Sequence, residues 1–124
     1  MKPSRRERSA AMHELALSQS IIDLVVECAR REKLHAVSRV TIEVGAAAGV
    51  EIETLRFCLE ALAEQTQAQG AELVITAIAL RARCRRCGCD YTPLSLISPC
   101  PGCDSHDRDL LAGRELLVRS IEGE

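Results

Sequence analysis

Four cysteines arranged as two Cys-x-x-Cys pairs are the clearest candidates for chemistry in this chain. The pairs, Cys84 with Cys87 and Cys100 with Cys103, are separated by twelve residues. Each pair lets two thiolates reach one metal ion from a single tight turn, and four sulfurs complete a tetrahedron. A closed shell of four thiolates suits Zn²⁺ and leaves no position for a catalytic water. The spacing therefore predicts a structural zinc site and argues against a zinc hydrolase.

Two further potential ligands lie beside these pairs. Cys89 follows Cys87 by two residues, and His106 follows Cys103 by three. With four thiolates available, we expect Cys89 to be a free or partly buried thiol and His106 to lie at the surface or to support the ligands from outside. Four thiolates around Zn²⁺ carry a formal charge of −2, and a nearby group of arginines is expected to offset it: Arg81, Arg83, Arg85 and Arg86.

A second candidate site is the run Met12-His13-Glu14, in which an imidazole and a carboxylate are adjacent. A helix is predicted from Glu14 to about Arg31, so this run is expected at the start of a helix, where backbone amides are unpaired. Alone the signal is weak, because a single histidine near a helix start is most often an exposed polar residue.

Hydrophobic periodicity predicts the elements that position these residues. Spacings of three and four residues indicate two helices, and alternation or β-branched runs indicate three strands. The helices are predicted at 14–31 and along the stripe from Leu55 to Thr66, and the strands at 38–44, 72–80 and 115–121.

These elements predict an α+β fold, with a small mixed three-stranded sheet, two helices and a zinc-ribbon-like module inserted between the last two strands. We expect residues 1–11 to form a disordered N-terminal extension. Residues 12–82 and 109–124 would form the main domain, and residues 83–108 the zinc module. Since this module has few apolar residues, it should depend on zinc, whose binding contributes on the order of 10 kcal/mol in small modules.

Composition restricts the class of protein. A length of 124 residues suits one domain. Aromatic residues make up only 2% of the chain and the net charge is −2, which argues against nucleic-acid binding by base stacking or by phosphate contacts. The cysteine count of seven is odd, and neither a secretory signal nor an apolar run of roughly 20 residues is evident. We therefore expect a cytoplasmic protein with no disulfide framework and no membrane segment.

Read together, these motifs resemble a known family. The runs Met12-His13-Glu14-Leu15-Ala16-Leu17, Val44-Gly45 with Gly49-Val50-Glu51, Gly70-Ala71-Glu72-Leu73, the two cysteine pairs and Gly113-Arg114-Glu115-Leu116 closely resemble the HypA/HybF family. Members of that family are nickel metallochaperones for [NiFe]-hydrogenase maturation. The resemblance extends from about Met12 to Glu122, with the motifs in the same order and at matching separations.

The resemblance implies two metal sites. Ni²⁺ would be the transported ion, bound by His13 with Glu14 assisting, and Zn²⁺ would be the structural ion held by the four cysteines. The backbone of Met12 and the side chain of Glu51 are further candidates for the nickel site. In the family the methionine normally carries a free terminal amine that can bind nickel, whereas here eleven residues precede Met12. Either Met12 is the biological start or another donor replaces the amine.

The resemblance also implies a carrier and not an enzyme. Its partners would be the hydrogenase large subunit, with urease as another possible recipient, and the maturation GTPase of the same pathway. The carrier would be a monomer or a weak homodimer. The alternative is a zinc-ribbon adaptor that binds protein or nucleic acid through the face from Arg81 to Arg86, with no nickel function.

Overall fold

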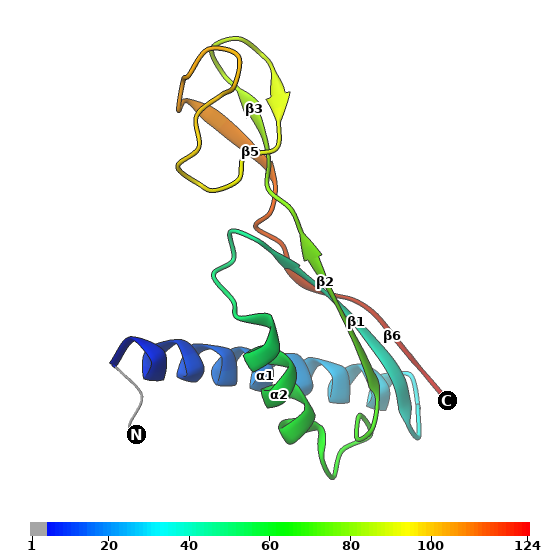
Figure 1. Cartoon of the computed structure of the whole chain (residues 1–124). Coiled ribbons are helices and arrows are strands. Elements are labelled where there is room, and N and C mark those ends of the chain that lie inside the picture. Colours follow the sequence, from blue (N-terminus) through cyan, green and yellow to red (C-terminus); the bar gives the residue numbers. More distant parts are fainter. Residues whose placement is uncertain (1–4) are drawn as a thin grey trace. The chain divides into compact units, whose positions relative to one another are not determined.

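The computed structural model describes residues 5–124, with side chains from His13 onward. Within that part the chain forms two helices and six strands (Figure 1). It divides into two compact units. The first unit contains the chain up to residue 42 together with 50–75 and 118–124, and the second contains 43–49 and 76–117.

The first unit is built around helices α1 (Arg5–Arg31) and α2 (Ile52–Ala63), which pack against each other. Each helix buries apolar residues at spacings of three and four, as its periodicity predicts. The buried residues are Ile21, Ile22, Val25 and Ala29 on α1, and Leu55, Leu59 and Ala63 on α2.

Helix α1 begins at Arg5, nine residues before the predicted start at Glu14. The prediction of unpaired backbone amides at Met12 and His13 is therefore wrong. Residues 5–11 were expected to be disordered, but they contain Arg, Glu, Ala and Ser with no Gly or Pro, and these residue types extend a helix at little cost. Residues 1–4 of the expected extension lie outside the described part of the chain.

A three-stranded sheet has the order β2-β1-β6, with β1 in the centre. Its strands are β1 (Val37–Gly45), β2 (Glu72–Ile78) and β6 (Leu116–Gly123). The strand predicted at 72–80 thus ends at Ile78.

Contacts along β1 give the directions of its two neighbours. Arg39, near the start of β1, pairs with Glu72 at the start of β2 and with Glu122 near the end of β6. At the other end of the two strands, the N–H of Ala46, the residue after β1, donates to the carbonyl of Ile78, the last residue of β2, at 2.9 Å. Strands β1 and β2 are therefore parallel, joined by the crossover helix α2, whereas β6 is antiparallel to β1. The predicted α+β fold with a small mixed sheet is confirmed.

Helix α2 ends at Ala63, earlier than the predicted stripe that reached Thr66. Glu64 leaves the helical conformation with a ψ of 138°, and Gln65 then adopts a positive φ of 64°. The N–H of Gln65 donates to the side-chain oxygen of Gln69 at 2.9 Å. The hydroxyl of Thr66 donates to the carbonyl of Ala63 at 2.6 Å. Thr66 therefore caps the end of α2 instead of extending it.

The second unit contains a small antiparallel sheet that the sequence did not reveal. Its strands are β3 (Arg81–Cys84), β4 (Asp90–Tyr91) and β5 (Arg108–Ala112), in the order β4-β3-β5. The register places Ala82 opposite Tyr91 and Leu110. Among the described residues, no helix combines the length and apolar character needed to span a membrane.

Candidate metal centre

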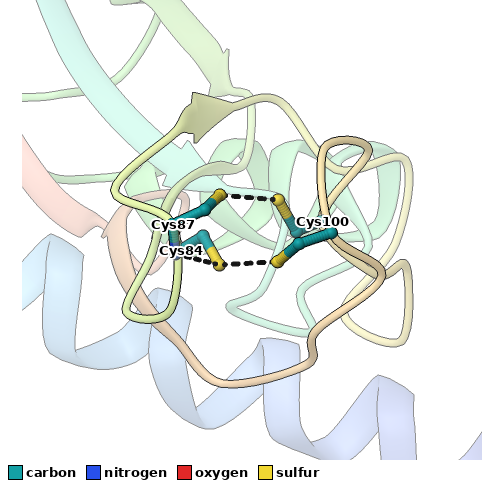
Figure 2. Close-up of side chains that lie close together, drawn as sticks. Cys84, Cys87 and Cys100 are labelled. Carbon is teal, nitrogen blue, oxygen red and sulfur yellow. Dashed lines mark hydrogen bonds between the residues drawn. The ribbon is translucent and has the colours of Figure 1, made fainter.

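The structure brings the four predicted cysteines together in the second unit. Their sulfurs all lie within 4.8 Å of one another, with 3.5 Å between Cys84 and Cys103 and 3.6 Å between Cys87 and Cys100. Figure 2 shows the sulfurs pointing toward a common centre. A zinc–sulfur bond of about 2.3 Å separates the sulfurs of a regular tetrahedron by about 3.8 Å, whereas a disulfide needs about 2.0 Å. The arrangement therefore fits one zinc ion and not a pair of disulfides.

The two Cys-x-x-Cys turns have the same backbone design. The N–H of Gly88 donates to the carbonyl of Cys84 at 2.9 Å, and the N–H of Asp104 donates to the carbonyl of Cys100 at 2.8 Å. Gly88 and Asp104 both adopt positive φ, at 77° and 59°. Neither residue is predicted as part of the site from the sequence, although Gly and Asp are among the residue types that tolerate this conformation.

Each turn also has one buried and one exposed ligand. Cys84 and Cys100 are buried, while Cys87 and Cys103 are exposed. Backbone amides point at the buried sulfurs, since the N–H of Cys87 lies 3.5 Å from the sulfur of Cys84 and that of Gly102 lies 3.4 Å from the sulfur of Cys100. These donors stabilise negative charge on the sulfurs, as a thiolate cage requires.

The cysteine thiols differ in acidity before a metal binds. The N–H of Cys87 is the main group that lowers the pKa of the Cys84 thiol to about 6. The pKa of Cys87 rises to about 12: the N–H of Cys89 opposes this shift, but the neighbouring thiol of Cys100, burial and the other cysteines outweigh it. Cys84 therefore ionises before Cys87, and metal binding must displace the proton of Cys87.

Neither Cys89 nor His106 belongs to this cluster, and both side chains are exposed. The carbonyl of Cys89 accepts a hydrogen bond from the N–H of Cys84 at 2.8 Å, as the carbonyl of Ser105 does from Cys100 at 2.9 Å. Cys89 thus supplies to the first turn the carbonyl that Ser105 supplies to the second. The thiol of Cys89 lies 3.4 Å from the carbonyl of Asp90.

The arginines near the cysteine pairs form ion pairs with aspartates. Arg83 binds Asp90 through two bonds of 2.7 and 3.2 Å, and Arg85 contacts Asp109 at 2.8 Å and Asp107 at 3.3 Å. The hydrogen bond from Arg83 lowers the pKa of Asp90. Arg83 and Arg85, which were expected to offset the thiolate charge, thus pair with aspartates in or beside β4 and β5.

The second candidate segment lies on α1 in the first unit. His13 is exposed, whereas the side chain of Glu14 is only 1% exposed. One carboxylate oxygen of Glu14 accepts a hydrogen bond from the N–H of Glu51 at 3.3 Å. The other oxygen is buried and has no hydrogen-bond partner among the described residues. Met12 lies within α1, but its side chain is outside the described part.

Glu51 lies next to Glu14 through its backbone and not through its side chain. Its carboxylate accepts a hydrogen bond from the N–H of Glu53 at 2.8 Å and caps the N-terminus of α2. The structure thus brings Glu51 beside Glu14 but uses the Glu51 carboxylate in helix capping, which also suits the positive end of the helix dipole.

Several hydrogenase maturation factors align with most of this chain. The hydrogenase maturation factor HypA of Chlorobium phaeobacteroides (strain BS1) is 40% identical over 110 residues, which cover 89% of this chain and 97% of the relative. The factor of the same name from Chlorobium limicola (strain DSM 245 / NBRC 103803 / 6330) is 42% identical, with 89% of this chain and 95% of the relative covered.

Solved structures share the fold. The solution structure of the Ni metallochaperone HypA from Helicobacter pylori matches with a TM-score of 0.62 and 22% identity, covering 89% of this chain and 96% of that one. A second HypA solution structure matches with a TM-score of 0.68 and 24% identity, covering 91% and 97%. The sequence profile described as "Hydrogenase/urease nickel incorporation, metallochaperone, hypA" matches residues 12–123. The chain therefore belongs to the HypA family of nickel metallochaperones.

Proposed function

We propose that this chain carries Ni²⁺ on the segment around His13 and delivers it to a hydrogenase large subunit, while Cys84, Cys87, Cys100 and Cys103 hold a structural Zn²⁺. Zinc shapes the second unit and takes no part in nickel transfer, because its shell of four thiolates is closed. The carrier works in the cytoplasm with the maturation GTPase of its pathway, as a monomer or weak homodimer.

The contrast between His13 and Glu14 carries this proposal. Glu14 is buried and anchored to the N–H of Glu51 at 3.3 Å, while the imidazole of His13 is free to bind an ion from solvent. A buried carboxylate oxygen without a partner is uncommon in folded proteins, and Glu14 has one. Such an oxygen supports a role for Glu14 at a metal site.

Helix α1 limits which donors can reach Ni²⁺. Ni²⁺ in tetragonal surroundings favours imidazole and other nitrogen donors. Because α1 runs through Met12 and His13, their backbone nitrogens are engaged in the helix. The imidazole and the Glu14 carboxylate are available in the helical state, whereas amide nitrogens become donors only when the helix opens before Glu14. Reversible opening suits a carrier, since it makes release of the ion possible.

The adaptor alternative is less well supported. It needs unpaired basic side chains on the face from Arg81 to Arg86 to contact phosphate or acidic partners. Arg83 and Arg85 are instead paired with Asp90, Asp107 and Asp109. Their charges are therefore already matched within the second unit.

Nickel titration by calorimetry tests the proposal. Zinc-loaded wild type should bind one Ni²⁺ per chain, and His13→Ala should weaken that binding about a hundredfold or more. His35→Ala is the matched control, because His35 is exposed but lies after α1, away from Glu14. Equal nickel binding by wild type and His13→Ala would refute the proposed site.

A chain trimmed to begin at Met12 tests the donor set separately. Its free amine and unwound amides should bind nickel more tightly than the full chain, and nickel should reduce the helical circular dichroism of the full chain. Zinc-loaded trimmed protein that binds no nickel would overturn the carrier function itself.

A further inference from the structure

The outer face of α2 combines carboxylates with an exposed aromatic ring. The helix buries Leu55, Leu59 and Ala63 on its inner face. At spacings of four, three and four residues, the opposite face of α2 and its C-cap residue present four exposed residues. These are Glu53, Phe57, Glu60 and Glu64. Phe57 is the only phenylalanine of the chain, and 72% of its surface is exposed.

This face is electrostatically unfavourable for the helix itself. Glu60 lies in the last turn of α2 and Glu64 is the C-cap residue, so two like charges stand at the end of the helix where negative charge opposes the helix dipole. Neither forms an ion pair with any residue in the described part of the chain. Arg56, the one basic residue of α2, instead donates to the carbonyl of Leu73 at 2.8 Å. Stability of α2 therefore does not explain these glutamates.

An open cavity of about 340 Å³ lies beside the two glutamates. Glu60 and Glu64 line it together with Ala63, Ala68, Ala71 and Leu73. Ala63 and Ala68 are buried, so part of the lining is apolar. A lysine or arginine side chain complements this lining, because its stem is apolar and its head is cationic. The cavity thus suits a basic side chain from another molecule.

We infer that the outer face of α2, formed by Glu53, Phe57, Glu60 and Glu64, is the docking surface for a protein partner with a basic patch. One lysine or arginine of that patch enters the cavity beside Glu60 and Glu64. Phe57, one turn earlier, contacts an apolar residue or a second cation of the partner. Charge complementarity selects this partner, because the three carboxylates of this face repel an acidic surface.

The partner is the protein that exchanges nickel with this chain. This identification of the partner rests on the proposed function. Helix α2 begins beside Glu14, where Glu51 donates to the Glu14 carboxylate. Its 12 residues extend about 18 Å. A partner domain roughly 30 Å across, docked on α2, therefore also reaches the segment of His13.

Binding to purified partners tests the inference. The probes are the maturation GTPase and the hydrogenase large-subunit precursor of the same organism, each titrated with zinc-loaded wild type, E60K/E64K and Phe57→Ser. Wild type should bind at least one probe, more weakly as salt rises, and E60K/E64K should weaken that binding about tenfold or more. Phe57→Ser should weaken it as well. The control E32K/E124K makes the same charge change at exposed residues outside this face.

The outcomes separate the docking surface from the nickel site. Weakened docking with unchanged nickel binding and an unchanged circular dichroism spectrum supports the inference. Equal losses of partner binding in E60K/E64K and E32K/E124K would show that only net charge matters, and would overturn the inference. Binding of neither probe by wild type, or an effect of E60K/E64K confined to self-association, would overturn it too. His13→Ala should lose nickel yet still dock, so failure of the carrier function would be seen independently.

Discussion

The buried carboxylate of Glu14 accepts a hydrogen bond from the backbone N–H of Glu51 at 3.3 Å, and this bond joins α1 to the first residue before α2. The bond links two segments that are 37 residues apart in the chain. It anchors the turn of α1 that carries His13. The second oxygen of Glu14 is buried without a hydrogen-bond partner in the described part of the chain. Only one of the two carboxylate oxygens therefore anchors the helix.

Substitutions at Glu14 should separate anchoring from nickel binding. Glu14→Ala leaves the N–H of Glu51 without its acceptor, and we expect it to lower the free energy of unfolding by about 1–3 kcal/mol. Glu14→Gln keeps a carbonyl oxygen for that N–H, and we expect a change below about 1 kcal/mol. Because the amide is a poorer metal ligand than a carboxylate, Glu14→Gln should still weaken nickel binding. Urea unfolding and nickel calorimetry measure the two effects.

Removal of zinc should unfold the second unit selectively. Its stability depends on a metal contribution on the order of 10 kcal/mol, since few apolar residues are buried there. A chelator should therefore collapse the amide NMR signals of residues 76–117, while those of α1 and α2 remain dispersed. Cys100→Ser should have the same effect.

Cys89→Ser is the matched control for the zinc site. Cys89 contributes its carbonyl to the first cysteine turn, and serine supplies the same carbonyl. Metal analysis of this variant should give one zinc per chain, as in wild type. Loss of zinc from Cys89→Ser, or a well-dispersed second unit after chelation, would contradict the assigned ligand set.

The sequence predicted best what depends on local periodicity or on repeated spacing. Alternating Val40 and Ile42 marked β1, and two Cys-x-x-Cys pairs marked a site whose sulfurs do lie within 4.8 Å. Strands β3, β4 and β5 escaped detection because they are short and rich in Arg and Asp, whose pairing across the sheet depends on tertiary register.

Features that depend on a single residue's conformation or on long-range contacts could not be predicted from the sequence either. Helix α2 ends where Glu64 becomes extended and the next residue, Gln65, takes a positive φ, a conformation uncommon for glutamine. The burial of Glu14 depends on a contact with Glu51, and no local pattern encodes such a pairing. The start of α1 at Arg5 was missed because the segment lacks the apolar periodicity that helix prediction relies on, although its residues favour a helix.

Gly45 should be intolerant of any side chain. A Cβ at this position would lie 2.1 Å from the carbonyl oxygen of Gly113, a backbone atom that hydrogen-bonds to the N–H of Ala47 at 2.6 Å. We expect Gly45→Ala to lower the free energy of unfolding by about 3 kcal/mol. Gly49→Ala should cost only about 1 kcal/mol, because Gly49 has positive φ but open space around it. Comparable costs in the two variants would show that the close approach is absent in solution.

Glu115 should stabilise the turn that precedes β6 in a pH-dependent manner. Its carboxylate accepts hydrogen bonds from its own N–H and that of Gly113, the latter at 2.5 Å, and these donors lower the pKa of Glu115 below the usual 4.5. Because the pKa is lower in the folded than in the unfolded chain, the stabilisation is complete above about pH 4.5 and disappears as the pH falls through the folded value. Glu115→Gln should therefore lower the unfolding temperature by a few degrees at pH 7. The measurement is the difference in unfolding temperature between zinc-loaded wild type and Glu115→Gln from pH 7 to pH 3.5. Acid affects the zinc site of both proteins equally, so that effect cancels in the difference. A difference that grows on acidification, or that is absent at pH 7, would refute this role of the Glu115 carboxylate.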